Sequence, residues 1–531
     1  MNLFLQALLT SIIVWIGFLD KAFLHTFFYR PIVIGPMVGL VFGDLSTGLE
    51  VGAAVELMFL AVIFVGTAIP PDETISAGLA AALACATGSV EVGIATALPI
   101  SFVGQIFRQT RNSTIYEVTQ RQVDKAAAEA NPKKVILWTS IIPSIFEYLF
   151  FGLPVFVGVY FGASYVQSFI DFIPTWLIDG ISAGTGLLGA VGVALLLGSV
   201  KDKSAWPYFI VGFVFASYLG VNMIGVALVA IVCVAMNYYG DKKAMADVVY
   251  EEVDDEGAKS YQVITKKDLW RTFRYALAIE SGNCTTRQEA DGFLQGMIPV
   301  LDKVYEDKEE RAEAYQRHCE LFLTEGRMAS FCIGISCAME ERNAKVGDID
   351  VDSINSIKVA LMGPLAGVGD SLIHGTLRPI MAGLACSMAA ASNYTSAIGP
   401  ILFFLVMTIV GMTVRYIGIF KGYEGGGLAL VSNLQQGGML DRLTKYAGIA
   451  AFTVCGGFIS SLVYVTLNVS YTQGETVVAL QEVLDGLMPN LIPLLYTLLM
   501  YYLIDKKKVN IILLMVFTIV LGILGVVSGI L

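Results

Sequence analysis

The sequence has little charge for its length. Only 15% of its 531 residues are Asp, Glu, Lys or Arg, whereas 56% are hydrophobic and the mean hydropathy is +0.69. Soluble domains contain roughly 25% charged residues, so this composition excludes an ordinary soluble chain. Apolar runs approach or exceed the ~20 residues of a spanning helix: Leu3–Leu19, Val135–Phe161, Ile181–Val200, Trp206–Tyr239, Ile398–Phe420, Tyr446–Leu467, Leu484–Ile504 and Ile511–Leu531. We therefore predict an all-α, polytopic helical protein of a lipid bilayer.

Histidine is scarce, and cysteine motifs are missing. There are three His, and the eight Cys form no CxxC pair and no metal-ligand spacing. This pattern excludes a disulfide framework or a zinc site, so we expect no metal. The net charge of −11 offers no basic surface, and we expect no nucleic-acid partner.

One acidic stretch interrupts the apolar pattern. Residues 244–262 are rich in Asp and Glu without helical periodicity, which is typical of a solvated linker. They separate a membrane domain, residues 1–243, from a second half, residues 263–531. Within that half, residues 263–350 are too charged to span and should form mostly cytoplasmic or surface helices, whereas residues 351–531 should form the membrane core. Basic residues in presumed short loops, among them Arg108 and Arg111, mark the cytoplasmic side.

Several polar side chains fall inside apolar segments of the first half. Ionisable residues at membrane depth are costly and often line a substrate path. The candidates for substrate contact are Glu56, Asp72, Glu73 and Gln105, and those for gating or structural roles are Asp20, Arg30 and Asp44. The alternative for the carboxylates is that each caps a broken helix. The run from Arg30 to Asp44 is too short to cross and contains Pro and Gly, so it predicts a re-entrant or broken helix that packs closely.

The second half contains one unusual polar stretch, residues 363–379, with the sequence Gly-Pro-Leu-Ala-Gly-Val-Gly-Asp-Ser-Leu-Ile-His-Gly-Thr-Leu-Arg-Pro. Backbone freed by Gly or Pro in a bilayer must find partners in protein or in a water-filled cavity. We therefore expect a broken segment on the substrate path. Its candidate substrate contacts are Asp370, His374 and Arg378, and its candidate gating or structural residues are Gly363, Gly367 and Gly369. For His374, the alternative is a histidine satisfied by backbone inside a helix break.

Each half has one Gly/Pro-interrupted element beside an Arg-Pro and a Gly-Asp pair. The pairs are Arg30-Pro31 with Gly43-Asp44, and Gly369-Asp370 with Arg378-Pro379. Corresponding broken segments in two halves indicate a transporter binding site. The reversed order of the pairs hints at inverted pseudo-symmetry.

Several of these motifs resemble those of a known family of membrane proteins. Residues 1–243 resemble the IIC subunit of mannose-type (mannose/fructose/sorbose) sugar phosphotransferase-system permeases, and residues 263–531 look like the IID subunit. The matching residues include Arg30-Pro31, Gly43-Asp44, Pro71-Asp72 and Gly104-Gln105 in the first half, and Arg317-His318, Glu340-Glu341, Gly363–Asp370, Gly375-Thr376 and Arg378-Pro379 in the second. The block from Gly363 to Pro379 is the most specific of them.

The resemblance implies a paired IIC–IID membrane complex that assembles as a trimer of such pairs in a bacterial inner membrane. It implies uptake of a sugar coupled to phosphorylation by a separate cytoplasmic IIAB phosphocarrier protein. The chain has no histidine in a soluble α/β domain and no Gly-rich phosphate loop between a strand and a helix. We therefore expect neither a catalytic residue nor a cofactor on this chain, which would be the membrane subunit of a sugar phosphotransferase of class EC 2.7.1.

Departures from the family pattern bear on the substrate, which we expect to be a hexose, an amino sugar or another sugar derivative. Phe64 stands where an Asn is common, and Glu73 where a small residue is usual. His374 lies in a block that is commonly Pro-Ile-Phe-Trp. Loss of an amide and gain of Glu73 and His374 favour an amine-bearing sugar over plain mannose or glucose.

Two other classes of function stay open at this point. A proton-coupled secondary sugar transporter would use Glu56, Asp72 and Asp370 as a proton relay. Neighbouring genes for IIA and IIB proteins would argue against it. A receptor or scaffold without transport is disfavoured, because buried charges are costly to retain without use.

Overall fold

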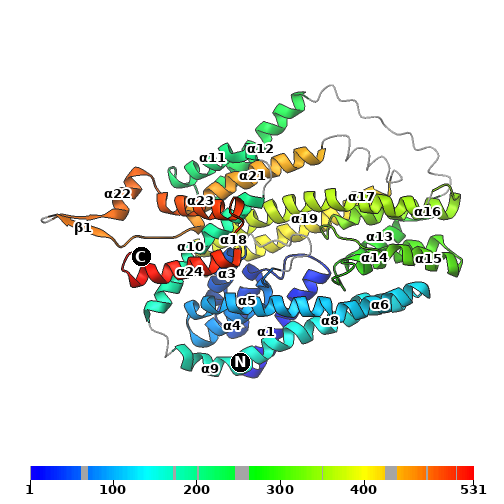
Figure 1. Ribbon diagram of the computed structural model, residues 1–531, viewed down its shortest axis with the longest axis horizontal. Coiled ribbons are helices and arrows are strands. Elements are labelled where there is room, and N and C mark those ends of the chain that lie inside the picture. The colour runs from blue at the N-terminus through cyan, green and yellow to red at the C-terminus, as the bar shows by residue number, and fades with distance from the viewer. Residues whose placement is uncertain are drawn as a thin grey trace.

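The protein is an elongated bundle of helices (Figure 1). The computed structural model describes all residues except 1, 61–69, 171–174, 200–202, 245–261, 350, 425–438, 474–475 and 510. The first half contains α1 (Leu3–Ala22), α2 (Pro31–Phe42), α3 (Leu45–Met58), α4 (Glu73–Thr87), α5 (Val90–Ser113), α6 (Ile115–Ala128), α7 (Pro132–Ile136), η1 (Leu137–Ile141), α8 (Ile142–Glu147), η2 (Tyr148–Gly152), α9 (Leu153–Ile170), α10 (Thr175–Ser199), η3 (Lys203–Ala205), α11 (Trp206–Ser217) and α12 (Met223–Ala244). The predicted linker, residues 244–262, lies almost entirely outside the described residues.

The second half is also helical apart from one hairpin. It contains α13 (Lys266–Ala276), α14 (Ala290–Val304), α15 (Lys308–His318), α16 (Ala329–Val346), α17 (Val351–Gly369), η5 (Asp370–Leu377), α18 (Arg378–Ala391), α19 (Ile398–Tyr423), α21 (Met439–Leu462), β1 (Ser470–Gln473), β2 (Thr476–Ala479), α22 (Leu480–Leu487), α23 (Leu491–Asp505) and α24 (Ile511–Val527). The strands β1 and β2 pair antiparallel. The predicted all-α class is confirmed, with this hairpin as a small exception.

Six described helical segments are long and apolar enough to cross a membrane. They are Leu3–Ala22, Val90–Ala128, Pro132–Gly162, Met223–Asp241, Val351–Ala391 and Ile398–Tyr423. The predicted single run Trp206–Tyr239 is wrong, because the chain turns between α11 and α12 at Gly220, whose φ is +63°. The run Leu484–Ile504 is likewise bent by 77° between α22 and α23. Two of the six, Val90–Ala128 and Val351–Ala391, are absent from the predicted runs because charged residues and Gly or Pro interrupt their apolar pattern.

The polar stretch 363–379 is a continuous helix rather than the predicted break. The chain passes from α17 through the π-helical segment η5 directly into α18. The N–H of Arg378 donates to the carbonyl of Ile373, five residues earlier. Proline lacks an N–H and clashes with the carbonyl four residues before it. A wider π turn removes that clash, so Pro379 is accommodated without interrupting the helix.

The same combination, a π-helical segment followed by a proline, occurs twice in the first half. The segments η1 and η2 end two residues before Pro143 and Pro154. In each, the residue preceding the proline donates to a carbonyl five residues earlier, Ile142 to Leu137 and Leu153 to Tyr148. π-Helical turns followed by proline therefore replace kinks along these long helices.

Helices α2 and α3 form a tight hairpin near the middle of the bundle. A Cβ atom built on Gly35 would lie 2.5 Å from Cα of Gly52, and one on Gly39 would lie 2.9 Å from Cα of Gly48. Only glycine allows such a close backbone approach. The predicted short helix and its close glycine packing are confirmed.

The charged helices α13–α16 gather at one end of the long axis, and the β hairpin lies at the other (Figure 1). The first half reaches this end through α6, which lies beside the loop before α14. There Arg287 Nη1 is 2.7 Å from Asp124 Oδ1, and the N–H of Thr286 donates to Glu117 Oε1 at 3.0 Å. The two halves therefore contact each other beyond the apolar spans as well as within them.

Candidate functional site

A polar cavity of about 370 Å³ lies between the two halves. The first half lines it from α1, α4, α5 and α8 and from the loops after α1 and before α4, and the second half from the loops before α14 and α16 and from α17, η5 and α18. Six carboxylic acids, Glu73, Glu147, Glu280, Glu289, Glu325 and Asp370, and four basic side chains, Lys21, Arg108, Arg111 and Arg378, line it. Small-molecule sites typically occupy about 300–1,000 Å³, so the cavity has room for a small polar solute.

Lys21 joins the two acids at the start of α4. Its Nζ lies 2.9 Å from Asp72 Oδ2 and 3.2 Å from Glu73 Oε1. Asp72 also accepts the N–H groups of Thr74 and Ile75 at 2.9 and 3.1 Å, and so caps α4. The carboxylate oxygens of Asp72 therefore bind the start of α4 and Lys21, whereas Glu73 lines the cavity.

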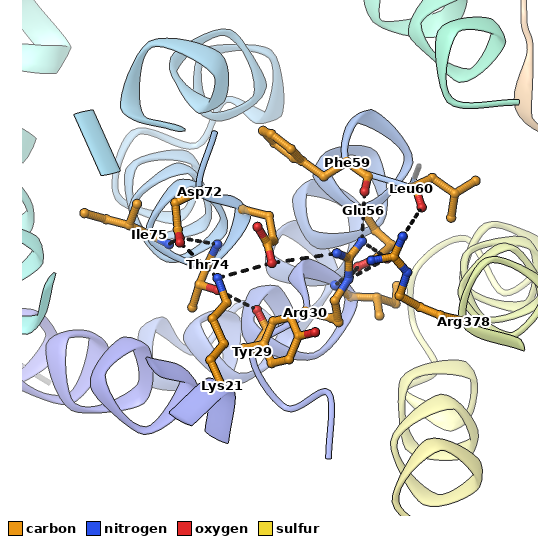
Figure 2. Close-up of polar contacts among 12 residues, drawn as sticks. Lys21, Tyr29, Arg30, Glu56, Phe59, Leu60, Asp72, Thr74, Ile75 and Arg378 are labelled. Carbon is orange, nitrogen blue, oxygen red and sulfur yellow. Dashed lines mark hydrogen bonds and ion pairs between the residues drawn. The ribbon is translucent and has the colours of Figure 1, made fainter. Parts of the chain in front are cut away.

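Arg30 and Glu56 form a buried ion pair behind this wall (Figure 2). Arg30 Nε donates to Glu56 Oε1 at 3.0 Å, and the N–H of Ile32 donates to Glu56 Oε2 at 3.3 Å. Both side chains are at most 1% exposed. Arg30 Nη1 lies 3.8 Å from Glu73 Oε1. The pair thus continues the charge network inward from the cavity, and Glu56 itself is not among the lining residues.

The two Arg-Pro motifs converge at the end of α3 (Figure 2). Arg30 Nη2 donates to the carbonyl of Phe59 at 3.2 Å, and Arg378 Nη2 donates to the carbonyl of Leu60 at 3.0 Å. Phe59 and Leu60 directly follow Met58, the last residue of α3. One arginine from each half therefore binds the backbone of the turn that ends this helix.

The second-half wall is organised around Glu325. It pairs with the guanidinium of Arg327 and accepts the backbone N–H groups of Arg327 and Met328 at 3.0 and 3.1 Å. His374 Nε2 lies 3.5 Å from Glu325 Oε1. A Cβ on Gly369 would lie 2.5 Å from Cβ of Glu325, so the helix approaches this residue closely.

His25, in the loop after α1, is held by the second half. Its Nε2 lies 2.7 Å from Glu280 Oε1, and its Nδ1 lies 3.1 Å from Arg415 Nη2. A guanidinium can only donate, so Nδ1 accepts and Nε2 carries the proton that Glu280 binds. Arg327 Nη2 also donates to the carbonyl of His25 at 2.7 Å. Asp20 holds the same loop from the first half by accepting the N–H of Thr26 at 2.9 Å.

The structure places the predicted site residues in three settings. Glu73, Asp370, His374, Arg378 and Gly363 line the cavity. Arg30, Glu56, Asp72 and Gly369 lie in the layer behind it. Four predicted residues do not line the cavity. Asp20 binds the loop that contains His25, and Asp44 caps α3. Gln105 lies on α5 and Gly367 on α17. No observation assigns a role to any of them, so the substrate-contact and gating assignments stay predictions.

Several residues that line the cavity were not predicted from the sequence. Arg108 and Arg111 were interpreted as loop residues marking the cytoplasmic side, but both lie on α5, and Arg111 is buried against Glu147. Basic residues that interrupt an otherwise apolar helix were the missed signal. Glu280 and Glu289 lie outside the apolar segments, where a carboxylate is unremarkable in sequence, so only the fold brings them to the cavity.

Two of the lining acids have opposite protonation preferences. Burial alone raises the pKa of Glu280, but the adjacent His25 outweighs it and the pKa is lowered overall. Burial raises the pKa of Glu289 well above its ordinary value, and the nearby carboxylate of Glu280 adds to this effect. The pKa values of these two lining acids are therefore shifted in opposite directions.

Comparison with known proteins identifies both halves. Residues 4–236 match the family model described as the sorbose-specific IIC component of the PTS system, and residues 263–531 match that of the mannose/fructose/sorbose family IID component. The mannose-specific EIID component of Escherichia coli K12 is 35% identical over 286 residues, 52% of this chain and 99% of that protein. The sorbose-specific EIID component of Lacticaseibacillus casei is 39% identical over 275 residues, 50% of this chain and 95% of that protein.

The first half has its own relatives. The mannose-specific EIIC component of E. coli K12 is 28% identical over 230 residues, 43% of this chain and 86% of that protein. Among solved structures, one chain of a cryo-EM structure of the mannose transporter ManYZ with microcin E492 aligns with half of this chain: the match covers 50% of this chain and 98% of that one at 35% identity, with a TM-score of 0.30. None of these findings supports the proton-coupled alternative. The chain is a multi-pass membrane protein of the mannose/fructose/sorbose family of phosphotransferase-system permeases, with IIC and IID components in one polypeptide.

Proposed function

We propose that the cavity between the halves is the sugar site of this permease. The observation that carries the proposal is that both components line one polar cavity, at the place where two Arg-Pro motifs meet. Carboxylates, guanidinium groups and imidazoles exchange hydrogen bonds with sugar hydroxyls. Glu73, Asp370, His374 and Arg378 would contact the sugar, and the Arg30–Glu56 and Lys21–Asp72 pairs would hold the wall in place.

The chain would act as the membrane subunit of a sugar phosphotransferase of class EC 2.7.1. A separate cytoplasmic IIAB protein would supply the phosphoryl group, and the IIC–IID unit would assemble as a trimer in a bacterial inner membrane. In this arrangement residues 1–243 form the IIC domain and residues 263–531 the IID domain, with residues 244–262 as a linker between them. The family relationship and the absence of a phosphate-carrying motif in the sequence support this assignment.

Phosphoenolpyruvate-dependent phosphorylation of a sugar panel tests the proposed function. Membranes containing the full chain, supplemented with the general phosphotransferase proteins and candidate IIAB proteins, should phosphorylate at least one sugar. Membranes without the chain are the control. Failure with every sugar and every IIAB protein, for a chain that is folded and inserted, would overturn the proposal.

A pair of substitutions on α17 tests the location of the sugar site. Gly363 lines the cavity and Gly367 lies one turn further along the same helix outside the lining set, and a Cβ on either glycine would meet no atom within 4 Å. Gly363→Leu should fill part of the cavity and reduce sugar uptake at least tenfold, whereas Gly367→Leu adds the same side chain elsewhere. Equal uptake by both variants would place the sugar site outside this cavity.

A further inference from the structure

Helix α13, the first helix of the second half, carries four basic side chains without acidic partners. Lys266, Lys267, Arg271 and Arg274 are exposed. Among the residues that the structure describes, none of the four makes an ion pair or a side-chain hydrogen bond. The single acid of the helix, Asp268, is bound by Lys303 of α14. The helix therefore presents four positive charges that no described residue neutralises.

These side chains share one face of α13. Residues three and four apart lie on the same side of a helix, so Lys266, Trp270 and Arg274 form one row. Lys267 and Arg271 form the row beside it. The opposite face is buried, and the helix packs against α14, α16 and α19 at the charged end of the molecule (Figure 1). The basic face does not take part in this packing and is open to a partner.

The neighbouring helix α19 shows where the surface of the bilayer lies. It is one of the helices that are long and apolar enough to cross a membrane. Its exposed side chains are apolar, apart from one threonine, as far as Ile417: Ile398, Ile401, Leu402, Leu405, Ile409, Thr413, Tyr416 and Ile417. The next exposed side chain is that of Lys421. The hydrocarbon region should therefore end between Ile417 and Lys421.

Trp270 of α13 lies beside this boundary. Its ring centroid is 5.5 Å from that of Tyr416 and 5.4 Å from that of Phe420. Trp270 is 48% exposed and Tyr416 43%, and partly exposed Trp and Tyr side chains are typical of the level of the lipid headgroups. The basic side chains around Trp270 should therefore lie at the height of the lipid phosphates.

We propose that the basic face of α13, formed by Lys266, Lys267, Arg271 and Arg274, binds the phosphate groups of anionic phospholipids. Basic residues of α6 and α7 mark this end of the molecule as cytoplasmic, and the cytoplasmic leaflet carries anionic lipids that attract basic segments beside a membrane span. Opposite charge favours these lipids over neutral ones. The contact of α13 with α19 favours a lipid over a soluble acidic protein.

Quenching by brominated lipids tests the inference on the full-length chain in vesicles. The vesicles contain phosphatidylcholine and phosphatidylglycerol in one fixed ratio, and an equal amount of either lipid carries the bromine. The sequence has five Trp, so the emission of Trp270 is taken as the difference between the wild type and Trp270→Phe. Brominated phosphatidylglycerol should quench it at least twofold more strongly than brominated phosphatidylcholine, and less so at high salt. Equal quenching by the two lipids would overturn the inference.

Matched variants show whether these charges attract the lipid. The combined change Lys266→Gln, Lys267→Gln, Arg271→Gln and Arg274→Gln should make the two lipids quench Trp270 equally. The control replaces four exposed basic residues of α6, α7 and α15 by Gln and should keep the wild-type ratio: Arg121, Lys125, Lys133 and Lys308. A preference for phosphatidylglycerol that survives the loss of the four charges on α13 would refute the proposal.

Two other partners for the same face give different results. A soluble acidic protein would bind whatever the lipid, and the wild type alone would then show equal quenching. The acidic stretch, residues 244–262, could occupy the face from within the chain. In that case the preference for phosphatidylglycerol would be absent from the wild type and would appear only when the six acids of the stretch are changed to amides: Asp247, Glu251, Glu252, Asp254, Asp255 and Glu256. Either result would overturn the proposal.

Discussion

Replacing Asp291 by Asn should stabilise the protein increasingly as the pH rises. Asp291 lies in the first turn of α14 and is 2% exposed. Neither of its carboxylate oxygens has a hydrogen-bond partner among the described residues. Burial raises its pKa from 3.8 to about 8, and the charge of Asp124 contributes to the increase.

The sign follows from proton uptake by the two states. Between pH 4 and 8 the folded protein keeps a proton on Asp291 that the unfolded chain releases, so its stability falls as the pH rises. At 1.36 kcal/mol per pKa unit, this acid costs on the order of 4 kcal/mol at pH 7 and about 6 kcal/mol above pH 8. An Asn side chain is neutral at every pH and removes this cost.

Thermal unfolding of the purified chain at pH 5, 6, 7 and 8 measures the effect. The stability difference between Asp291→Asn and wild type should grow by about 1.4 kcal/mol per pH unit up to pH 7 and by less towards pH 8. If unfolding is irreversible, the shift in Tm at one fixed scan rate replaces the free energy as the quantity compared. Asp348→Asn, an exposed acid paired with Arg342, is the control and should show no such growth. A constant difference between Asp291→Asn and wild type across this range would refute the reasoning.

Three further predictions concern the charge network, the cavity wall and the linker. Glu56→Gln leaves Arg30 buried without its main counter-charge and should destabilise the protein by about 3–5 kcal/mol; normal thermal stability with lost uptake would instead indicate substrate contact. Gly326→Ala places a Cβ 2.9 Å from Glu280 Oε1 and should weaken sugar binding at unchanged expression, and binding at wild-type affinity would contradict this. Splitting the chain before Met245 should leave two pieces that co-purify and transport, whereas loss of assembly with both pieces stable would show that the linker organises the complex.

Helix content and membrane class could be predicted because they depend on composition and on the length of apolar runs. The short helix α2 and its close packing were also predictable, since the spacing of Gly35 and Gly39 signals a close helix contact, but its partner α3 was not. The boundaries of the membrane spans were harder to predict from the sequence. The helix containing Gly363, Asp370 and Pro379 looks broken in sequence, because the rule that proline interrupts a helix does not anticipate a π turn that absorbs it.

The candidate site was predictable only in part, because sequence reveals unusual residues but not their partners. Asp370 and His374 stand out as polar groups in an apolar run, and both line the cavity. Glu56 stands out equally, yet its oxygens are occupied by Arg30 and by backbone. Glu289 lies in a charged region of the sequence, where one more acid is unremarkable. Only the tertiary structure brings it to the cavity.

The contacts between the second half and the loop around His25 have a consequence for biogenesis. Glu280, Arg327 and Arg415 all bind this one loop, so these contacts form only when the two halves have met. In relatives that each correspond to one half, the partners must find each other by diffusion in the bilayer. Here a single translation product fixes their ratio at one to one, and a covalent connection raises the effective concentration of each for the other. Completion of the fold then becomes independent of how much protein a cell makes.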